Sequence, residues 1–108
     1  MHRQPEAVRE LRLAVQLDPD SALAHHYLAT ALFNGEDFAS AETEFRQALR
    51  LQPTAGNHYY LSACLMSLGH YDAALVELEA AARLEPGEDL YRTRKQELIK
   101  LMKASNRR

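Results

Sequence analysis

The sequence lacks the residues that several kinds of functional site require. It has a single cysteine, Cys64, which rules out an internal disulfide and a four-cysteine zinc site. Its four glycines are scattered singly along the chain, so there is no glycine-rich phosphate-binding loop. It also has neither an apolar run of the roughly 18 residues that a membrane span needs nor the apolar block of a secretory signal. These absences predict one soluble domain without a nucleotide site and favour a cytoplasmic location.

Basic residues are scarce in most of the chain, and acidic residues are scarce in its last segment. The formal net charge is −2, but residues 1–89 hold 6 basic and 14 acidic side chains, whereas residues 90–108 hold 7 basic and one acidic. A basic tail can bind nucleic acid or acidic lipid. The alternative is that the basic segment complements its own helix dipole and the acidic body. We favour this alternative, because Tyr91 is the only aromatic residue among the cations and base stacking needs more.

A short apolar motif occurs three times and predicts helices. The same steps of four, three, three and two separate its members in every copy, and the closing prolines recur at nearly equal intervals. Such steps place side chains on one stripe of an α-helix, and the proline ends the helix because it lacks a donor. The three copies are Ala7, Leu11, Ala14, Leu17, Pro19; Ala41, Phe45, Ala48, Leu51, Pro53; and Ala74, Leu78, Ala81, Leu84, Pro86.

A second helical motif lies between these copies. Leu28, Ala29 and Leu32 form it in one interval, and Leu61, Ser62 and Leu65 form it in the next. Turn residues separate the two motifs at 34–37 and 68–71, and no window has the alternation of a strand. The sequence therefore predicts an all-α chain with helices near 5–17, 21–34, 38–51, 55–68, 72–84 and 88–104.

The alternating motifs resemble the tetratricopeptide repeat (TPR), whose period is about 34 residues. Gly69 to Ala74 is similar to the family's turn between helices, while Gly35 lies one residue early. The resemblance implies a right-handed superhelical array of antiparallel helix pairs, with about six helices and a C-terminal capping helix. The implied divisions are a partial repeat at 1–20, full repeats at 22–54 and 55–87, and a capping helix with a basic tail at 88–108.

Residues that could carry chemistry are better explained as structure. His25 and His58 fall on the inner stripe and are predicted to be partly buried, and no histidine pair has the spacing of a metal site. Cys64 lies on the stacking side of its helix and is predicted to be a small buried hydrophobe. Paired carboxylates, Glu42 with Glu44 and Glu77 with Glu79, are two positions apart and are interpreted as a solvated face. We therefore expect no enzymatic activity, no metal and no cofactor.

The side opposite the inner stripe of each first helix is the candidate binding surface. By the TPR resemblance these helices line a concave groove that holds a peptide, and exposed aromatics are suited to anchoring one. The alternative is that these side chains pack among themselves or under the last helix. The predicted groove residues are Leu23, His26, Tyr27, Thr30, Phe33, Asn34, Tyr59, Tyr60, Ala63 and Met66, extended by Arg92, Gln96 and Lys100 on the last helix.

The sequence thus predicts a protein-interaction module whose partner is a peptide segment or helix with apolar anchors, with an acidic residue near Arg92 and Lys100. Lys and Asn grip a terminal carboxylate in TPR modules that resemble chaperone adaptors, and His26 and Thr30 stand at those places here, which argues against a chaperone tail as the ligand. A structural alternative is self-association, because the first motif, with Leu11 at its centre, has no preceding partner helix in the sequence. Neither membrane nor nucleic acid is an expected partner.

Overall fold

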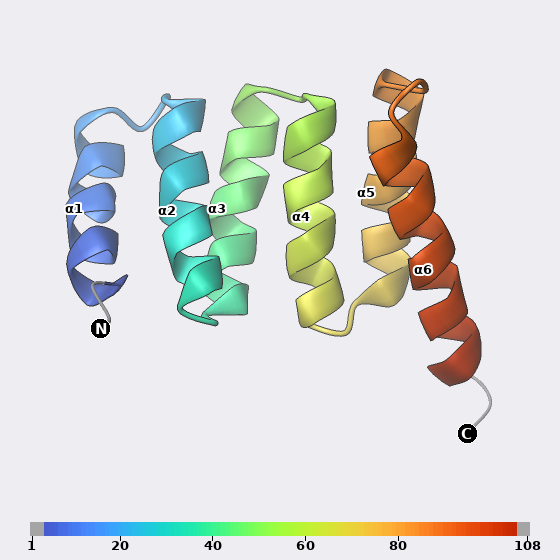
Figure 1. Ribbon diagram of the computed structural model, residues 1–108. Coiled ribbons are helices and arrows are strands. Elements are labelled where there is room, and N and C mark those ends of the chain that lie inside the picture. Colours follow the sequence, from blue (N-terminus) through green and yellow to red (C-terminus); the bar gives the residue numbers. More distant parts are fainter. Residues whose placement is uncertain (1–3, 106–108) are drawn as a thin grey trace. The chain divides into compact units, whose positions relative to one another are not determined.

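The computed structural model describes residues 4–105, and every regular element in that range is an α-helix (Figure 1). The prediction of an all-α chain with six helices is confirmed, and each helix end lies within one position of its predicted place. None of the helices within residues 4–105 is long and apolar enough to cross a membrane. The helices are α1 Gln4–Leu17, α2 Ala22–Asn34, α3 Phe38–Leu51, α4 Ala55–Ser67, α5 Tyr71–Leu84 and α6 Asp89–Ser105.

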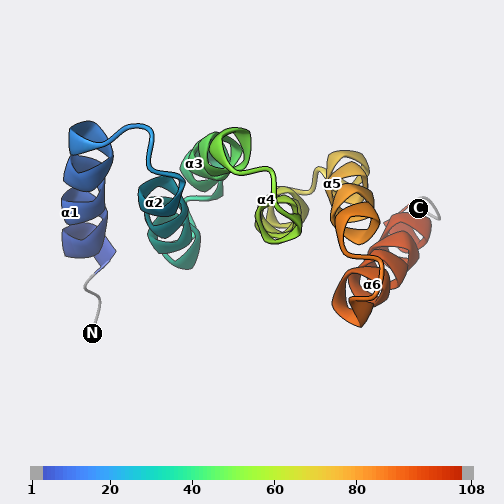
Figure 2. The same cartoon turned by 90° about the horizontal axis from the view of Figure 1, so that it is seen from above.

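The chain divides into two compact units, Met1–Pro53 and Thr54–Arg108, which we call unit 1 and unit 2. In unit 1, α2 packs against both α1 and α3. In unit 2, α5 packs against both α4 and α6. Figure 2 shows α3 beside α2 and α5 beside α4, so each unit contains one antiparallel helix pair and one further helix.

The repeated motifs form the buried core of each unit. Small residues let the helix backbones approach closely, and the leucines and Phe45 fill the space between them. Unit 2 contains a cluster in which Ala55, Ala81 and Tyr91 pack together, with Tyr59 and Ala82 against them. The motif residues that are at most 5% exposed are Leu28, Ala29, Leu32, Ala41, Phe45 and Ala48 in unit 1, and Leu61, Ser62, Leu65, Ala74, Leu78 and Ala81 in unit 2.

Local residues explain where the helices begin. Ser21, Asp37 and Thr54 each precede a helix, and each side chain accepts a hydrogen bond from the backbone N–H three positions later, at 3.1 to 3.3 Å. Such a bond satisfies one of the free donors in the first turn. His70, at the position equivalent to Asp37 before α5, makes no such bond.

The two turns inside the helix pairs share one backbone conformation. Gly69 has φ +79°, in the left-handed region that suits glycine after a helix. The equivalent residue one repeat earlier is Glu36, with φ 65°. The early position of Gly35 in the sequence therefore places a glutamate where the turn favours glycine.

The last helix, α6, is anchored by few residues. Tyr91 and Leu98 are its buried side chains, and the Nζ atom of Lys95 lies 3.4 Å from the Oε2 atom of Glu79 on α5. Most of its remaining surface is exposed, as expected of a capping helix. The last two arginines of the basic tail, Arg107 and Arg108, lie outside the described residues.

Candidate functional site

In unit 1, one histidine ring lies between an exposed tyrosine of the predicted groove and a buried phenylalanine of the core. Leu23 and Tyr27 on α2 are 59% and 52% exposed. The His26 ring lies 5.8 Å from the Tyr27 ring and 6.0 Å from the ring of buried Phe45, between ring centroids. The packing of His26 on Phe45 therefore holds Tyr27 at the surface without burying it.

Other predicted residues of α2 are partly used within the unit. The Thr30 hydroxyl donates to the His26 carbonyl at 2.9 Å. The half-buried Phe33 ring meets Phe38 edge-on, with centroids 5.1 Å apart, and Asn34 is exposed at the end of the helix. We call Leu23, His26, Tyr27, Thr30, Phe33 and Asn34 the unit-1 face.

Burial lowers the pKa of His26 below its ordinary value of 6.5. The unfolded chain therefore takes up a proton at a pH where the folded ring stays neutral, so the free energy of unfolding falls as the pH drops below about 6.5. Above that pH this contribution is fully present. We expect His26→Phe, which keeps a ring against Phe45, to have a shallower loss of stability between neutral and mildly acidic pH than the parent.

Urea unfolding of both proteins at several pH values measures this difference, because the two proteins differ only at position 26. Parallel curves would show that His26 titrates alike in the folded and unfolded chains.

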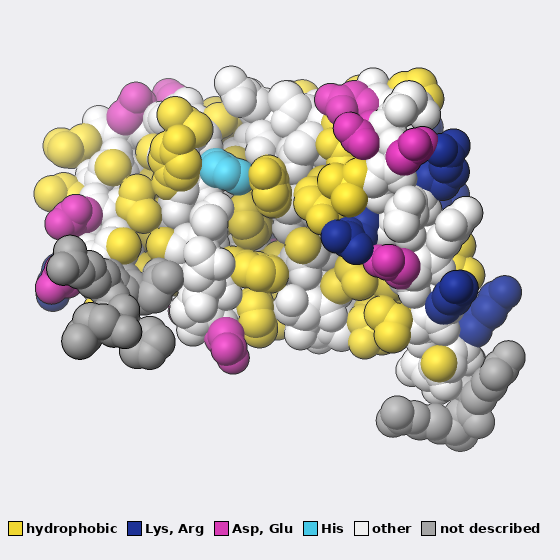
Figure 3. Space-filling view, in the orientation of Figure 1, with side chains coloured by type: hydrophobic (Ala, Val, Ile, Leu, Met, Phe, Trp, Pro, Cys, Tyr) yellow, Lys and Arg dark blue, Asp and Glu magenta, His cyan; other side chains and the backbone are white. Residues whose placement is uncertain are grey.

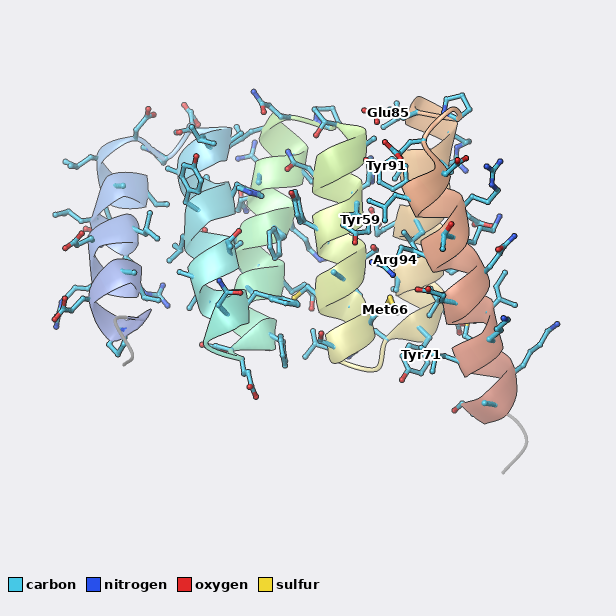
Figure 4. The ribbon with its side chains drawn as sticks, viewed as in Figure 1. Tyr59, Met66, Tyr71, Glu85, Tyr91 and Arg94 are labelled. Carbon is cyan, nitrogen blue, oxygen red and sulfur yellow. The ribbon has the colours of Figure 1, made fainter. Side chains whose placement is uncertain are left out.

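In unit 2, three tyrosines from two helices form one cluster. The Tyr59 ring lies 5.7 Å from Tyr60 on the same helix and 5.7 Å from Tyr91 on α6, between centroids. Tyr60 is 42% exposed, whereas Tyr91 is 7% exposed. Ala63 and Met66 on α4 are half-buried. Figure 4 shows Tyr91, Tyr59, Arg94 and Met66 following one another in the space between α4 and α6.

Charged groups surround this cluster. Burial is the largest cause that raises the pKa of Tyr91, followed by the carboxylates of Glu85 and Glu88. Arg94 donates through Nε to the Tyr59 hydroxyl at 3.4 Å and through a terminal nitrogen to Glu97 at 2.9 Å. The hydrogen bond to Tyr59 is the first cause that raises the pKa of Arg94.

Sequence reasoning missed two residues of this surface, Tyr91 and Arg94. Arg94 stands one repeat after Leu61, so a cation takes the register position of a core leucine and breaks the repeat. The three residues predicted to extend the groove on α6 are exposed: Arg92 pairs with Asp89, and Gln96 and Lys100 lie further along the helix. We call Tyr59, Tyr60, Ala63, Met66, Tyr91 and Arg94 the unit-2 face.

The histidines predicted to be structural are bonded into their units. His25 is 6% exposed, and its two ring nitrogens lie 2.7 Å from Glu44 Oε1 and 2.8 Å from the Pro19 carbonyl oxygen. The same pairing recurs in the next repeat, where His58 Nδ1 lies 2.7 Å from Glu77 Oε1. The structural interpretation of both histidines is therefore confirmed.

The solvated-face interpretation is wrong for two of the carboxylates. The side chains of Glu44 and Glu77 are 16% and 17% exposed because each turns toward the histidine of the neighbouring helix. Cys64 is fully buried, as predicted. Residues 4–105 contain no group of three or more side chains arranged to hold a metal ion.

Comparisons with known proteins identify the repeat type. Residues 1–81 match the model of the family described as "Anaphase-promoting complex, cyclosome, subunit 3". No relative was found among curated proteins.

Solved TPR structures are similar in fold. One is the first TPR of Spaghetti (RPAP3) bound to the HSP90 peptide SRMEEVD, with 20% identity and a TM-score of 0.85 over 93% of this chain and 80% of that one. Another is the first TPR domain of human RPAP3, with 19% identity and a TM-score of 0.87 over 97% and 84% of the two chains. A thermophilic TPR protein of Thermus thermophilus, TTC0263, has 24% identity and a TM-score of 0.81, and 89% of this chain covers 50% of it.

Proposed function

Because the chain belongs to the TPR-type family described as "Anaphase-promoting complex, cyclosome, subunit 3", we propose that it is a non-enzymatic protein-interaction module. Its ligand is a peptide segment or a helix of another protein with apolar anchor residues. The observation that carries this proposal is the pair of tyrosines, Tyr27 and Tyr60, that remain exposed while their ring neighbours are anchored in the core of each unit.

Side chains of this kind suit peptide anchoring. A tyrosine offers a large apolar area, loses little conformational freedom on binding, and keeps a hydroxyl for a hydrogen bond. Figure 3 shows apolar side chains gathered between α4 and α6 in unit 2. One continuous groove, and the role of Arg92, Gln96 and Lys100 in it, stay predictions.

Selection from a displayed library of random peptides tests this function. We expect the parent chain to enrich peptides with large apolar residues, and a Tyr27→Ala/Tyr60→Ala double variant to lose that enrichment. A library that yields no enriched peptides, or the same peptides with both proteins, would argue against these faces.

The energetic prediction concerns single variants. Tyr27→Ala and Tyr60→Ala should each weaken binding of a selected peptide by about 1–4 kcal/mol if the tyrosine anchors it. Because both side chains are half exposed, each variant should unfold within about 1 kcal/mol of the parent. Calorimetric titration and thermal melting measure the two quantities on the same samples.

A matched control is Val76→Ala on α5, since Val76 is apolar and 58% exposed but belongs to neither face. It should change neither binding nor melting. If the tyrosine variants melt as early as a core variant, the tyrosines are part of the core and the ligand must bind elsewhere.

The second candidate, self-association, rests on α1. None of its described side chains is fully buried, and Leu13 and Leu17 are 54% and 78% exposed. Exposed apolar stripes favour contacts with another chain. Sedimentation over a wide concentration range decides this: a mass that rises with concentration in the parent, and not in Leu13→Ser/Leu17→Ser, supports it, and a constant monomer mass rejects it.

A further inference from the structure

We infer that the unit-2 face binds a peptide segment that carries a lysine or arginine side chain, and that this cation lies against the tyrosine rings beside Glu85 and Glu88. The inference rests on the proposed function, since it names the chemistry of the peptide. It differs from the acidic residue that the sequence predicts near Arg92 and Lys100.

The first argument is the arrangement of rings. Tyr59 lies between Tyr60 and Tyr91, 5.7 Å from each, so the three rings form one aromatic surface drawn from α4 and α6. The face of an aromatic ring carries partial negative charge and attracts cations. With 42% of its surface exposed, Tyr60 makes this aromatic surface reachable from solvent.

The second argument is the balance of charge around those rings. Asp89 is paired with Arg92, and Glu97 is paired with Arg94. Among residues 4–105, neither Glu85 nor Glu88 takes part in an ion pair, although a Glu88 oxygen accepts the Leu90 N–H at 3.2 Å. Two carboxylates therefore remain without an ion-pair partner at this end of unit 2.

These two carboxylates act on the tyrosine cluster itself. After burial, they are the next largest causes that raise the pKa of Tyr91. Figure 3 shows acidic side chains at the upper end of the unit-2 face, directly above the apolar ones. A cation at the rings would be attracted by both the carboxylates and the ring faces.

The order of residues along the face limits where the cation can lie. In Figure 4, Glu85 lies above Tyr91 and Tyr59, Arg94 lies below them, and Met66 and Tyr71 follow. Arg94 repels a second cation from the middle of the face. An apolar residue of the peptide would then contact Met66, so the face selects a basic residue next to an apolar one.

Two matched peptides test the inference. The first probe is SRMKKVK, which is the peptide SRMEEVD bound by the first TPR of Spaghetti with its three acidic residues replaced by lysine. The second is SQMQQVQ, in which all four basic residues of the first probe are glutamine. We expect SRMKKVK to bind the full chain more tightly in a calorimetric titration. We expect Glu85→Gln/Glu88→Gln to weaken its binding about two- to fivefold, the range of an exposed interaction between a cation and an aromatic or charged group.

A control separates a local site from net charge. Glu6→Gln/Glu10→Gln on α1 removes the same two charges from exposed positions in unit 1 and should leave the affinity for SRMKKVK unchanged. The inference is overturned if SQMQQVQ binds as tightly as SRMKKVK, if both double variants weaken binding equally, or if neither peptide binds. The proposed function fails separately, when the random library yields no peptide whose binding depends on Tyr27 or Tyr60.

Discussion

Leu61→Ala is expected to lower the free energy of unfolding by about 2–5 kcal/mol, the range for a buried leucine truncated in a well-packed core. Leu61 is fully buried in α4, and α4 packs on α5, whose buried side chains include Ala74, Leu78 and Ala81. Small residues such as Ala74 hold the two backbones close together, so the helices cannot collapse further to fill the space left by the leucine. Denaturant unfolding followed by circular dichroism measures the loss.

The neighbouring residue provides the control. Tyr60→Ala removes a larger side chain one position earlier in the same helix, yet its effect on unfolding should stay within about 1 kcal/mol because 42% of the tyrosine is exposed. Backbone amide exchange resolves the effect by unit: Leu61→Ala should speed exchange mainly in residues of unit 2. Equal losses from Leu61→Ala and Tyr60→Ala would mean that Tyr60 belongs to the core as well.

The bounds of the helices could be predicted from the sequence because the residues that determine them are close together in the chain. Apolar steps of three and four fix the buried stripe, and Pro19, Pro53 and Pro86 fix where α1, α3 and α5 end. The unusual turn between α2 and α3 can also be recognised in the sequence. Gly35 stands one position before the place that Gly69 has in the next repeat, so Glu36 takes the left-handed conformation instead.

The candidate site was less predictable because its contacts join different helices. A helical wheel places Glu44 and Glu77 at the edge of the core stripe, but it cannot show that a histidine of the preceding helix lies beside each of them. Arg94 shows the same limit: its charge identifies it as a break in the repeat, while its contact with Tyr59 depends on how α6 packs in unit 2. The spacing of apolar residues predicts which face of a helix is buried. Which side chain of another helix lies beside a given residue depends on how the helices pack.

Partner residues also decide which aromatics remain available. Tyr27 and Phe33 are both predicted groove residues on α2, but Phe33 has Phe38 beside it and is half-buried, whereas Tyr27 is 52% exposed. The sequence therefore predicts more anchor residues than the structure leaves accessible.

Breaking the repeated histidine–glutamate pair should have the second large effect. His25→Ala is expected to cost about 2–4 kcal/mol, because it removes a ring that is 6% exposed and leaves the Glu44 carboxylate and the Pro19 carbonyl without their hydrogen bonds to it. The effect should be smaller for His58→Ala in unit 2, since the His58 side chain is 19% exposed and water can reach the carboxylate more easily. Denaturant unfolding of both variants gives the comparison.

A double-mutant cycle shows whether the pair itself carries the cost. Once His25 is gone, the Glu44 carboxylate is a buried charge without its partner, so His25→Ala/Glu44→Ala should destabilise less than the sum of the two single variants, with a coupling of about 0.5–3 kcal/mol. Glu44→Gln retains an oxygen that can accept from the His25 ring and should cost less than Glu44→Ala. Strict additivity would mean that the two side chains stabilise unit 1 only by filling space, and the recurrence of the pair at His58 and Glu77 would then reflect shape rather than hydrogen bonding.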